Sequence, residues 1–298
     1  MSGLSPPTLQ DGSAMPPLIF GTRINAHRHT QPDILQALQS EFRAIDTAPT
    51  RKFHNEDQDG NAIRTAFLEH ITKRESLFVQ TKYTSPYGHA MDQTTWPYNI
   101  EDSHSLRVLK SLARSIKDLQ VDCFDAYFLH RPLESIVDTL EVWRTMEDVA
   151  LRGGARYLGL SNVDAATLGH VWNQASIKPV FVQNSFRHRE GGYDVDVVKF
   201  CKQKGIVYQV FGVFWAGNEG LFGCELVREL VEQGMTVHQA LIRALVDGSK
   251  TIGLRVCIVS GTRSKTHMEE SAAALELELN SEPTSVAAFL RLLGWDGI

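Results

Sequence analysis

Residues 125–130 read Asp-Ala-Tyr-Phe-Leu-His, a short run of β-forming side chains that ends on a histidine. Similar runs of mostly apolar or β-branched residues occur on both sides of it, at 17–20, 43–46, 77–81, 157–160, 180–183, 207–211 and 256–259. Continuous apolar runs of this length are typical of parallel strands that are buried on both faces. The sequence therefore predicts eight parallel strands.

Amphipathic stretches separate these strands. In residues 103–119, Leu106, Leu109, Leu112, Ile116 and Leu119 recur at helical spacing. The same pattern predicts helices at 33–42, 132–149, 165–173, 195–204, 236–246 and 266–277, with a short helix at 287–293 near the C-terminus. Two longer loops, 85–100 and 212–223, follow the third and seventh strands and are rich in aromatic residues and glycine.

Strand and helix alternate along all 298 residues without a break in composition. This alternation predicts an α/β fold with one domain, a closed (β/α)8 TIM barrel, with residues 1–16 as a flexible N-terminal extension. A doubly wound open sheet is the alternative, but such a sheet usually carries Gly-x-Gly-x-x-Gly after its first strand. Here that position reads Gly21-Thr22-Arg23.

Charge and composition narrow the class of protein. Hydrophobic residues make up 43% of the chain, charged residues 22%, and the net charge is −5. Nucleic-acid and anionic-membrane surfaces need clustered lysine and arginine, so we expect neither partner. The cysteines at 123, 201, 224 and 257 have no metal-ligand spacing, and the N-terminus lacks the pattern of a signal peptide. We expect a cytoplasmic protein, a monomer or weak homodimer, that acts on a small molecule.

Three polar residues stand where predicted strands two, three and four end: Asp46, Lys82 and His130. Each has an ordinary structural explanation, as a turn residue, a solvated lysine or a satisfied histidine. A barrel, however, gathers these strand ends at one mouth, where active sites lie. A lysine held beside a carboxylate lowers the pKa of a nearby proton donor, and a histidine can donate a hydrogen bond to a carbonyl oxygen. Together the three residues predict a site that reduces a carbonyl group.

Six motifs occur in the order RAIDTA, FVQTKY, FDAYFLHRP, YLGLSN, FVQN and GTRSKTHMEE. This series resembles the aldo-keto reductase family over about residues 17–277, and most closely a fungal-type branch of it. Members of that family reduce aldehydes and ketones with NADPH, using an aspartate, a tyrosine, a lysine and a histidine. The resemblance implies that Asp46, Lys82 and His130 occupy three of those four positions.

The tyrosine of the family pattern is missing. No tyrosine lies between Asp46 and Glu56, and the expected position falls on Phe53 when counted from Asn55-Glu56 or on Arg51 when counted from Asp46. His54 is the nearest side chain that exchanges a proton near neutral pH. It is either a substitute for the tyrosine or a solvated loop residue.

The cofactor positions of the family are better represented. The resemblance assigns Ser161, Asn162 and Gln183 to the nicotinamide amide, and Phe211 to stacking on the nicotinamide ring, although a packed core ring is the alternative for Phe211. It assigns the 2′-phosphate and the adenine to Gly261, Thr262, Arg263, His267 and Glu270, where helix amides and a guanidinium can hold a phosphate. Gly261 and Ser271 replace a lysine and an asparagine of the family. The expected cofactor is therefore NADPH or NADP+, with binding retained, weakened or vestigial.

Arginines also follow several strands, at positions 23, 51, 131, 187 and 189. They are either solvated or mark a site for an anionic substrate. Three functions follow: an NADPH-dependent reductase of a sizeable carbonyl or enone compound, in which His130 and His54 supply the proton; a non-redox isomerase, cyclase or lyase that uses His54, Lys82 and His130; and a catalytically silent regulatory or binding subunit.

Overall fold

The computed structural model describes residue 9 and residues 11–23, 31–278 and 280–298. Within these residues, eight strands follow one another in the order β1 to β8 of a closed parallel barrel, so the predicted (β/α)8 class is confirmed. The predicted flexible extension, residues 1–16, lies mainly outside the described residues; within it, Leu9 and Met15 are buried. No helix in the described part of the chain is long and apolar enough to cross a membrane.

The chain divides into two compact units, Phe20–Val182 and the combination of Met1–Ile19 with Gln183–Ile298. In the first unit, the end of β1 (Leu18–Gly21) pairs with β2 (Ala44–Asp46), followed in order by β3 (Phe78–Tyr83), β4 (Phe124–Leu129) and β5 (Ala155–Ser161). Asp46 lies opposite Gln80, and Lys82 opposite Phe128. This register carries both charged side chains toward the carboxyl ends of the strands.

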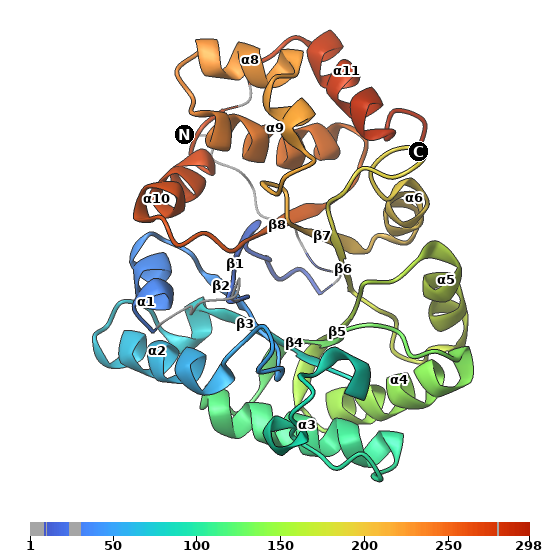
Figure 1. The fold of residues 1–298 in the computed structure, drawn as a ribbon. Coiled ribbons are helices and arrows are strands. Elements are labelled where there is room, and N and C mark those ends of the chain that lie inside the picture. Colours follow the sequence, from blue (N-terminus) through green and yellow to red (C-terminus); the bar gives the residue numbers. More distant parts are fainter. Residues whose placement is uncertain (1–8, 10, 24–30, 279) are drawn as a thin grey trace. The chain divides into compact units, whose positions relative to one another are not determined.

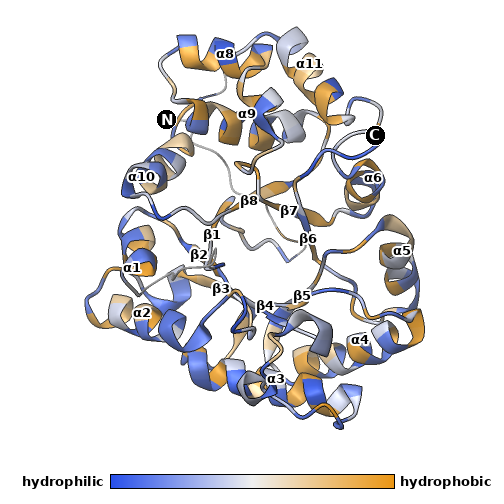
Figure 2. Ribbon diagram, in the orientation of Figure 1, coloured by the Kyte–Doolittle hydropathy of each residue, from blue (hydrophilic) through white to orange (hydrophobic). Residues whose placement is uncertain are grey.

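Helices lie outside the strands of this unit (Figure 1): α1 (Gln31–Gln39), α2 (Glu56–Leu68), α3 (His104–Leu119), α4 (Ile136–Leu151) and α5 (Ala165–Gln174). Hydrophilic and hydrophobic positions alternate along α3 and α4 in Figure 2, as expected for helices with one buried face. Short 3-10 turns, Arg74–Ser76, Pro86–Gly88 and Gln93–Thr95, flank β3.

The sequence missed helix α2. Its inner face carries Glu56 and Asp59, both buried, so the apolar periodicity that predicts a helix is interrupted. Gly60 lets α2 approach α3 closely, because a Cβ atom at that position would come within 2.1 Å of the Asp118 carbonyl oxygen. A larger residue at Gly60 would force the two helices apart.

Two other boundaries were wrong in ways that affect the site. The third strand extends to Tyr83 rather than to residue 81, so Lys82 lies inside β3 instead of after it. The helix predicted from residue 132 begins at Ile136, because the Ser135 side chain accepts a hydrogen bond from the Asp138 backbone N–H and caps the helix there. Residues 131–134 are therefore a loop after β4.

The second unit contains most of β6 (Phe181–Ser185), together with β7 (Val207–Phe211) and β8 (Val256–Ser260). Strands β7 and β8 are parallel, with Tyr208 opposite Val256. The helices are α6 (Val195–Lys204), α7 (Glu219–Phe222), α8 (Glu225–Glu232), α9 (Val237–Thr251), α10 (Lys265–Ala274) and α11 (Pro283–Leu293). Helices α7 and α8 were not predicted. Trp295 is buried after α11, where its Nε1 donates to the Tyr193 carbonyl oxygen at 2.7 Å.

Candidate active site

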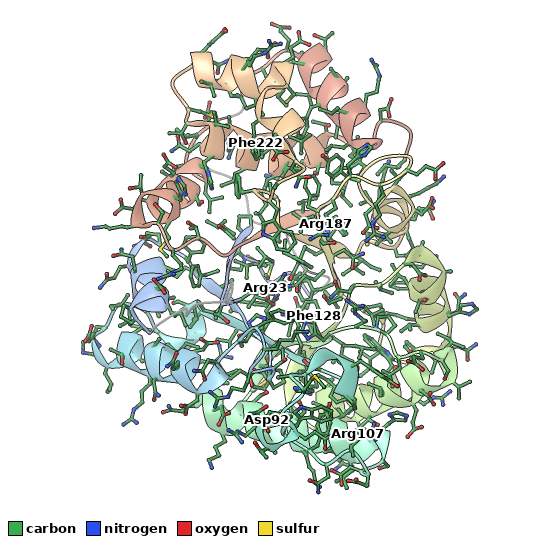
Figure 3. The ribbon with its side chains drawn as sticks, in the orientation of Figure 1. Arg23, Asp92, Arg107, Phe128, Arg187 and Phe222 are labelled. Carbon is green, nitrogen blue, oxygen red and sulfur yellow. The ribbon has the colours of Figure 1, made fainter. Side chains whose placement is uncertain are left out.

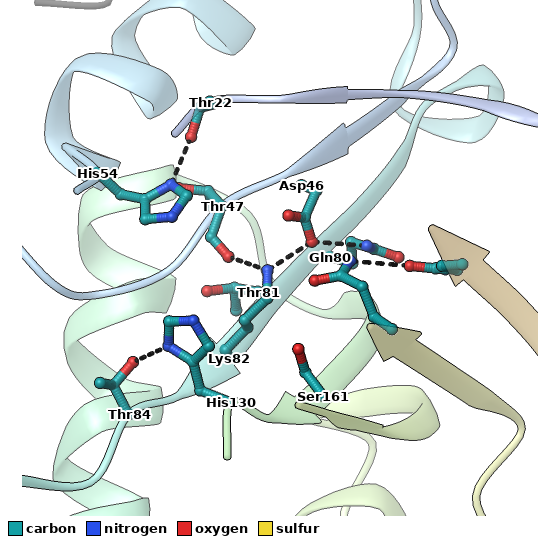
Figure 4. Close-up of polar contacts among 12 residues, drawn as sticks. Thr22, Asp46, Thr47, His54, Gln80, Thr81, Lys82, Thr84, His130 and Ser161 are labelled. Atoms are coloured by element: carbon teal, nitrogen blue, oxygen red, sulfur yellow. Dashed lines mark hydrogen bonds and ion pairs between the residues drawn. The ribbon is translucent and has the colours of Figure 1, made fainter. Parts of the chain in front are cut away.

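A buried ion pair forms the centre of the polar cluster in the first unit (Figure 4). The Lys82 ammonium donates to Asp46 Oδ1 at 2.6 Å and to the Thr47 carbonyl oxygen at 2.9 Å. Gln80 Nε2 donates to the same Asp46 oxygen at 2.6 Å. Lys82 is only 2% exposed and Asp46 5%. Buried charges persist only when they are paired and hydrogen-bonded, which is the case for both groups.

His130 follows β4 and is held on three sides. Its Nδ1 forms a 2.8 Å hydrogen bond with the Thr84 hydroxyl, its backbone N–H donates to the Tyr83 carbonyl oxygen, and its own carbonyl oxygen accepts from Asn162 Nδ2. Burial holds the pKa of His130 well below its usual range, and the positive charge of Lys82 lowers it further. The imidazole is therefore neutral at pH 7.

His54 lies in the turn between β2 and α2 and is only 6% exposed, so it is not a solvated loop residue. Its Nδ1 lies 3.1 Å from the Thr22 hydroxyl oxygen, and its backbone N–H donates to the Thr50 carbonyl oxygen. In Figure 4, the imidazoles of His54 and His130 lie on the same side of the Lys82 ammonium, one above the other. The cluster thus holds a paired lysine, the buried imidazole of His54 and the half-buried imidazole of His130.

The two positions at which the family pattern predicts a tyrosine have different surroundings. Phe53 presents its ring to the Arg23 guanidinium, 4.8 Å from the ring centroid, and to the Lys52 ammonium at 5.0 Å. Arg51 is exposed and donates to the Asn55 side chain. Neither side chain carries a hydroxyl. In Figure 3, Asp92 and Arg107 lie away from Arg23 and Phe128, and Arg107 belongs to α3.

Two acids beneath this cluster were not singled out from the sequence. The hydroxyls of Thr22 and Thr47 donate to Asp59 Oδ2 at 2.9 and 2.6 Å, and burial raises the pKa of Asp59 to about 7. Glu56, one helical turn earlier, accepts from the hydroxyls of Thr81 and Ser115, and burial raises its pKa to about 8. Their i, i+3 spacing on one face of α2 was the available signal. It is easily mistaken for a solvated acidic face.

Two of the predicted cofactor residues belong to the first unit. Ser161 is buried at the end of β5, and Asn162 follows it with a left-handed φ of 54°. Asparagine adopts this conformation more readily than most residues. The Asn162 amide nitrogen donates to the His130 carbonyl oxygen at 2.9 Å and to Ser161 Oγ at 3.1 Å. Asn162 is thus hydrogen-bonded to His130 directly, and Ser161 is connected to it through Asn162.

In the second unit, Gln183 Nε2 donates to Gln209 Oε1 at 2.9 Å, and both side chains are buried. Phe211 is partly exposed at the end of β7, with the edge of its ring on Trp215 at 5.7 Å. Gly212 permits this contact, because its φ is 79° and a Cβ atom there would come within 2.6 Å of the Trp215 ring. Phe211 is therefore a ring at a strand end and not a fully packed core residue.

The segment after β8 is more exposed. Gly261, Arg263 and His267 are exposed, whereas Thr262 and Glu270 are half-buried. The Ser264 side chain caps α10 by accepting from the His267 backbone N–H at 3.3 Å. The His267 ring also stacks on His238, with centroids 4.5 Å apart. An exposed helix N-terminus with Arg263 beside it has the donor set that suits a phosphate.

Known proteins resemble this chain along most of its length. The model of the aldo/keto reductase family matches residues 17–218. The aldo-keto reductase AKR2E4 of Bombyx mori is 29% identical over 219 residues, which are 69% of this chain and 65% of that protein. Methylglyoxal reductase DkgA of Escherichia coli is 26% identical over 254 residues, 82% of this chain and 80% of that protein.

A crystal structure of the Bombyx mori enzyme in complex with NADP has the same fold, with a TM-score of 0.75 and 23% identity over 97% of this chain and 93% of that one. The family model covers more than half of the present sequence. The eight-stranded closed barrel agrees with this match. The chain therefore belongs to the aldo/keto reductase family.

Proposed function

We propose that this protein is an NADPH-dependent reductase of a carbonyl or enone compound in which histidines replace the tyrosine of the family. The observation that carries the proposal is the Lys82 ammonium, paired with Asp46 in a buried position and accompanied by the imidazoles of His54 and His130. A fixed cation can stabilise negative charge on a carbonyl oxygen, and an imidazole can donate a hydrogen bond or a proton to it.

The donor set of the chain fits a nicotinamide dinucleotide phosphate. Ser161, Asn162 and Gln183 offer a hydroxyl and two amides at strand ends, and Phe211 offers a partly exposed ring. Arg263 and the N-terminus of α10 offer cationic and amide donors for a phosphate. The cofactor, when bound, supplies the hydride. The glycine at position 261, where the family has a lysine, leads us to expect weaker binding than in a typical member.

The residues of the first unit would handle the oxygen and its proton. Since His130 is neutral at pH 7, it would orient the carbonyl oxygen through a ring N–H and would not deliver a net proton. His54, once protonated, would transfer a proton to that oxygen as the hydride reaches the carbon. The Lys82 ammonium would stabilise the negative charge that develops on the oxygen.

An anionic substrate is part of the proposal. The charges of Arg23 and Arg131 act on His130, as the lowering of its pKa records. These guanidiniums therefore lie close enough to the reacting groups to attract a carboxylate or an enolate. Arg187 and Arg189, in the second unit, are exposed.

The decisive experiment titrates NADPH with the protein and follows the fluorescence of the nicotinamide. We expect a saturable change, followed by NADPH consumption with aldehydes, methylglyoxal, quinones and keto acids. A fluorescence signal that stays constant up to high micromolar protein would overturn the proposal. Phe53→Tyr sharpens it, because activity toward simple aldehydes should rise if the missing hydroxyl diverted the site.

One observation favours a second candidate, a non-redox isomerase, cyclase or lyase that uses the same three residues. A neutral His130 beside an ammonium is suited to proton abstraction next to a carbonyl group, with the lysine stabilising the enolate. Turnover of an acidic or polyene substrate without NADPH consumption would support this candidate. NADPH consumed in step with product would exclude it.

A further inference from the structure

We propose that Asp59, acting through Thr22, keeps the ring proton of neutral His54 on Nδ1 and so makes Nε2 the nitrogen that exchanges protons with the substrate. Asp59 is then a positioning residue, because it contacts neither the substrate nor the imidazole. The catalytic consequence of this inference rests on the proposed function, whereas the assignment of the ring proton does not.

The chain of contacts is short and buried. His54 Nδ1 lies 3.1 Å from Thr22 Oγ1, and Thr22 Oγ1 lies 2.9 Å from Asp59 Oδ2. Thr22 is fully buried, and Asp59 is 2% exposed. Water therefore does not compete for these polar atoms, and each has to be satisfied by its protein neighbours.

The direction of the hydrogen bonds follows from the number of protons. Asp59 Oδ2 accepts from the hydroxyls of Thr22 and Thr47. A threonine hydroxyl has one hydrogen, so once Thr22 donates to Asp59, its oxygen can only accept from His54. The atom that donates to it is the Nδ1–H of the imidazole. In a neutral ring the other nitrogen, Nε2, then carries the lone pair.

This order holds for the ionised acid. The carboxylate accepts from the hydroxyls of Thr22 and Thr47 and donates to neither, so the Thr22 oxygen is left as the acceptor for His54. Because burial raises the pKa of Asp59 to about 7, the ring proton of His54 is assigned above that pH.

The same acid also connects His54 to the lysine. Thr47 donates its hydroxyl to Asp59, and its carbonyl oxygen accepts from the Lys82 ammonium at 2.9 Å. Asp59 is thus joined through Thr22 to the imidazole and through Thr47 to the backbone that holds Lys82. A change at Asp59 is expected to reach both functional groups.

The proton balance in the proposed reduction is simple. A bound cofactor would supply the hydride to the carbonyl carbon, and the carbonyl oxygen would take the proton from Nε2 of the His54 imidazolium. His54 remains neutral with Nδ1 protonated, hydrogen-bonded to Thr22. Solvent returns a proton to Nε2 before the next turnover. In the opposite tautomer, Nε2–H could donate a hydrogen bond but could not accept the proton in the reverse reaction.

The test is the nitrogen spectrum of the histidine rings. The protein is labelled with ¹⁵N-histidine without cofactor, the His54 signals are assigned from their loss in His54→Gln, and long-range proton–nitrogen correlations are recorded at a pH where the ring is neutral. We expect a protonated Nδ1 and an unprotonated Nε2. A protonated Nε2 in the wild-type protein would overturn the inference.

Variants test the role of each link. Thr22→Val removes the acceptor, so the His54 tautomers should become mixed, whereas Thr22→Ser should restore the wild-type spectrum. Asp59→Ala should let the Thr22 hydroxyl turn toward Nδ1 and shift the proton to Nε2. Glu56→Gln is the matched control, because it alters an equally buried acid on the same helix that contacts Thr81 and Ser115 instead. An unchanged His54 spectrum in both Thr22→Val and Asp59→Ala would refute the inference.

Activity gives a second, separate reading. If the protein reduces a substrate, Thr22→Val should lower kcat by about 10- to 100-fold with little change in KM, since general acid–base catalysis contributes about 10²- to 10⁴-fold. Thr22→Ser should recover most of this loss. A protein without reductase activity that has the expected tautomer would refute the proposed function and leave the positioning inference standing. A protein with reductase activity but with the ring proton of His54 on Nε2 would refute the positioning inference and leave the proposed function standing.

Discussion

Two lysine–carboxylate pairs of this protein differ in almost every physical respect. Lys82 and Asp46, in the first unit, are 2.6 Å apart, with side chains 3% and 7% exposed. Lys265 and Glu269, on α10 of the second unit, are 3.6 Å apart and 64% and 56% exposed. Exposed pairs contribute about 0–1 kcal/mol, whereas removing one partner of a buried pair costs several kcal/mol. Pairs of similar residue types thus contribute very differently to stability, and the difference follows from their burial.

The largest expected effect comes from breaking the buried pair. Lys82→Met leaves the Asp46 charge buried beside Gln80 without its cation, and we expect a loss of about 3–5 kcal/mol in the free energy of unfolding. Urea denaturation measures it. Lys265→Met is the control and should change stability by less than about 1 kcal/mol. Equal effects of the two variants would contradict the distinction drawn from burial.

The buried acids of α2 make the next prediction. The pKa of Glu56 is raised from 4.5 to about 8, so between these values the unfolded chain loses the proton while the folded protein retains it. Stability should therefore fall as pH rises from about 4.5 to 8, by up to about 1.4 kcal/mol per pH unit. Glu56→Gln should remove this contribution and stabilise the protein at pH 8 but not at pH 4.

Unfolding free energies at pH 4, 6 and 8 check this prediction. Asp59, whose pKa is raised to about 7, adds a dependence of the same sign that remains in Glu56→Gln. Exposed Glu269 provides the comparison, since Glu269→Gln should leave the wild-type pH dependence intact. If Glu56→Gln and wild type have parallel stability curves from pH 4 to 8, Glu56 is not protonated in the folded protein.

The smallest effect on stability is expected at the exposed segment after β8. Arg263→Gln should change the free energy of unfolding by less than about 0.5 kcal/mol, as is usual for surface substitutions. If Arg263 holds the 2′-phosphate, affinity for NADPH should nevertheless fall about 10-fold, equivalent to about 1.4 kcal/mol. Affinity for NADH should be unchanged. A similar loss for both cofactors would exclude contact between Arg263 and the 2′-phosphate.

Much of the fold could be predicted from the sequence, because its signals are local. Every one of the eight strands appears near its predicted position, since apolar runs such as residues 207–211 have one stable arrangement in a parallel sheet. Helix α3 was predicted to within one residue from its leucine spacing. Helix α2 was missed because its buried face is partly acidic, and α8 because its eight residues are short for a periodic signal.

The residues of the candidate site could be predicted only in part from such local signals. Asp46, Lys82 and His130 could be selected because each stands at or beside the carboxyl end of a strand, and these ends meet at one face of a barrel. The burial of His54 and the contacts of Asp59 could not be predicted from the sequence. Both depend on which side of a turn or helix faces the interior, and no local pattern reports that.

The alternation of strands and helices and the family could be recognised from the sequence, because each depends on short runs of consecutive residues. The contacts of the polar side chains depend on the tertiary structure. Thr22, His54 and Asp59 are separated by up to 37 positions, yet they form one buried hydrogen-bonded chain. Burial, which no single residue specifies, removes water as a competitor. The buried polar side chains therefore hydrogen-bond to one another, which fixes which atoms donate and which accept.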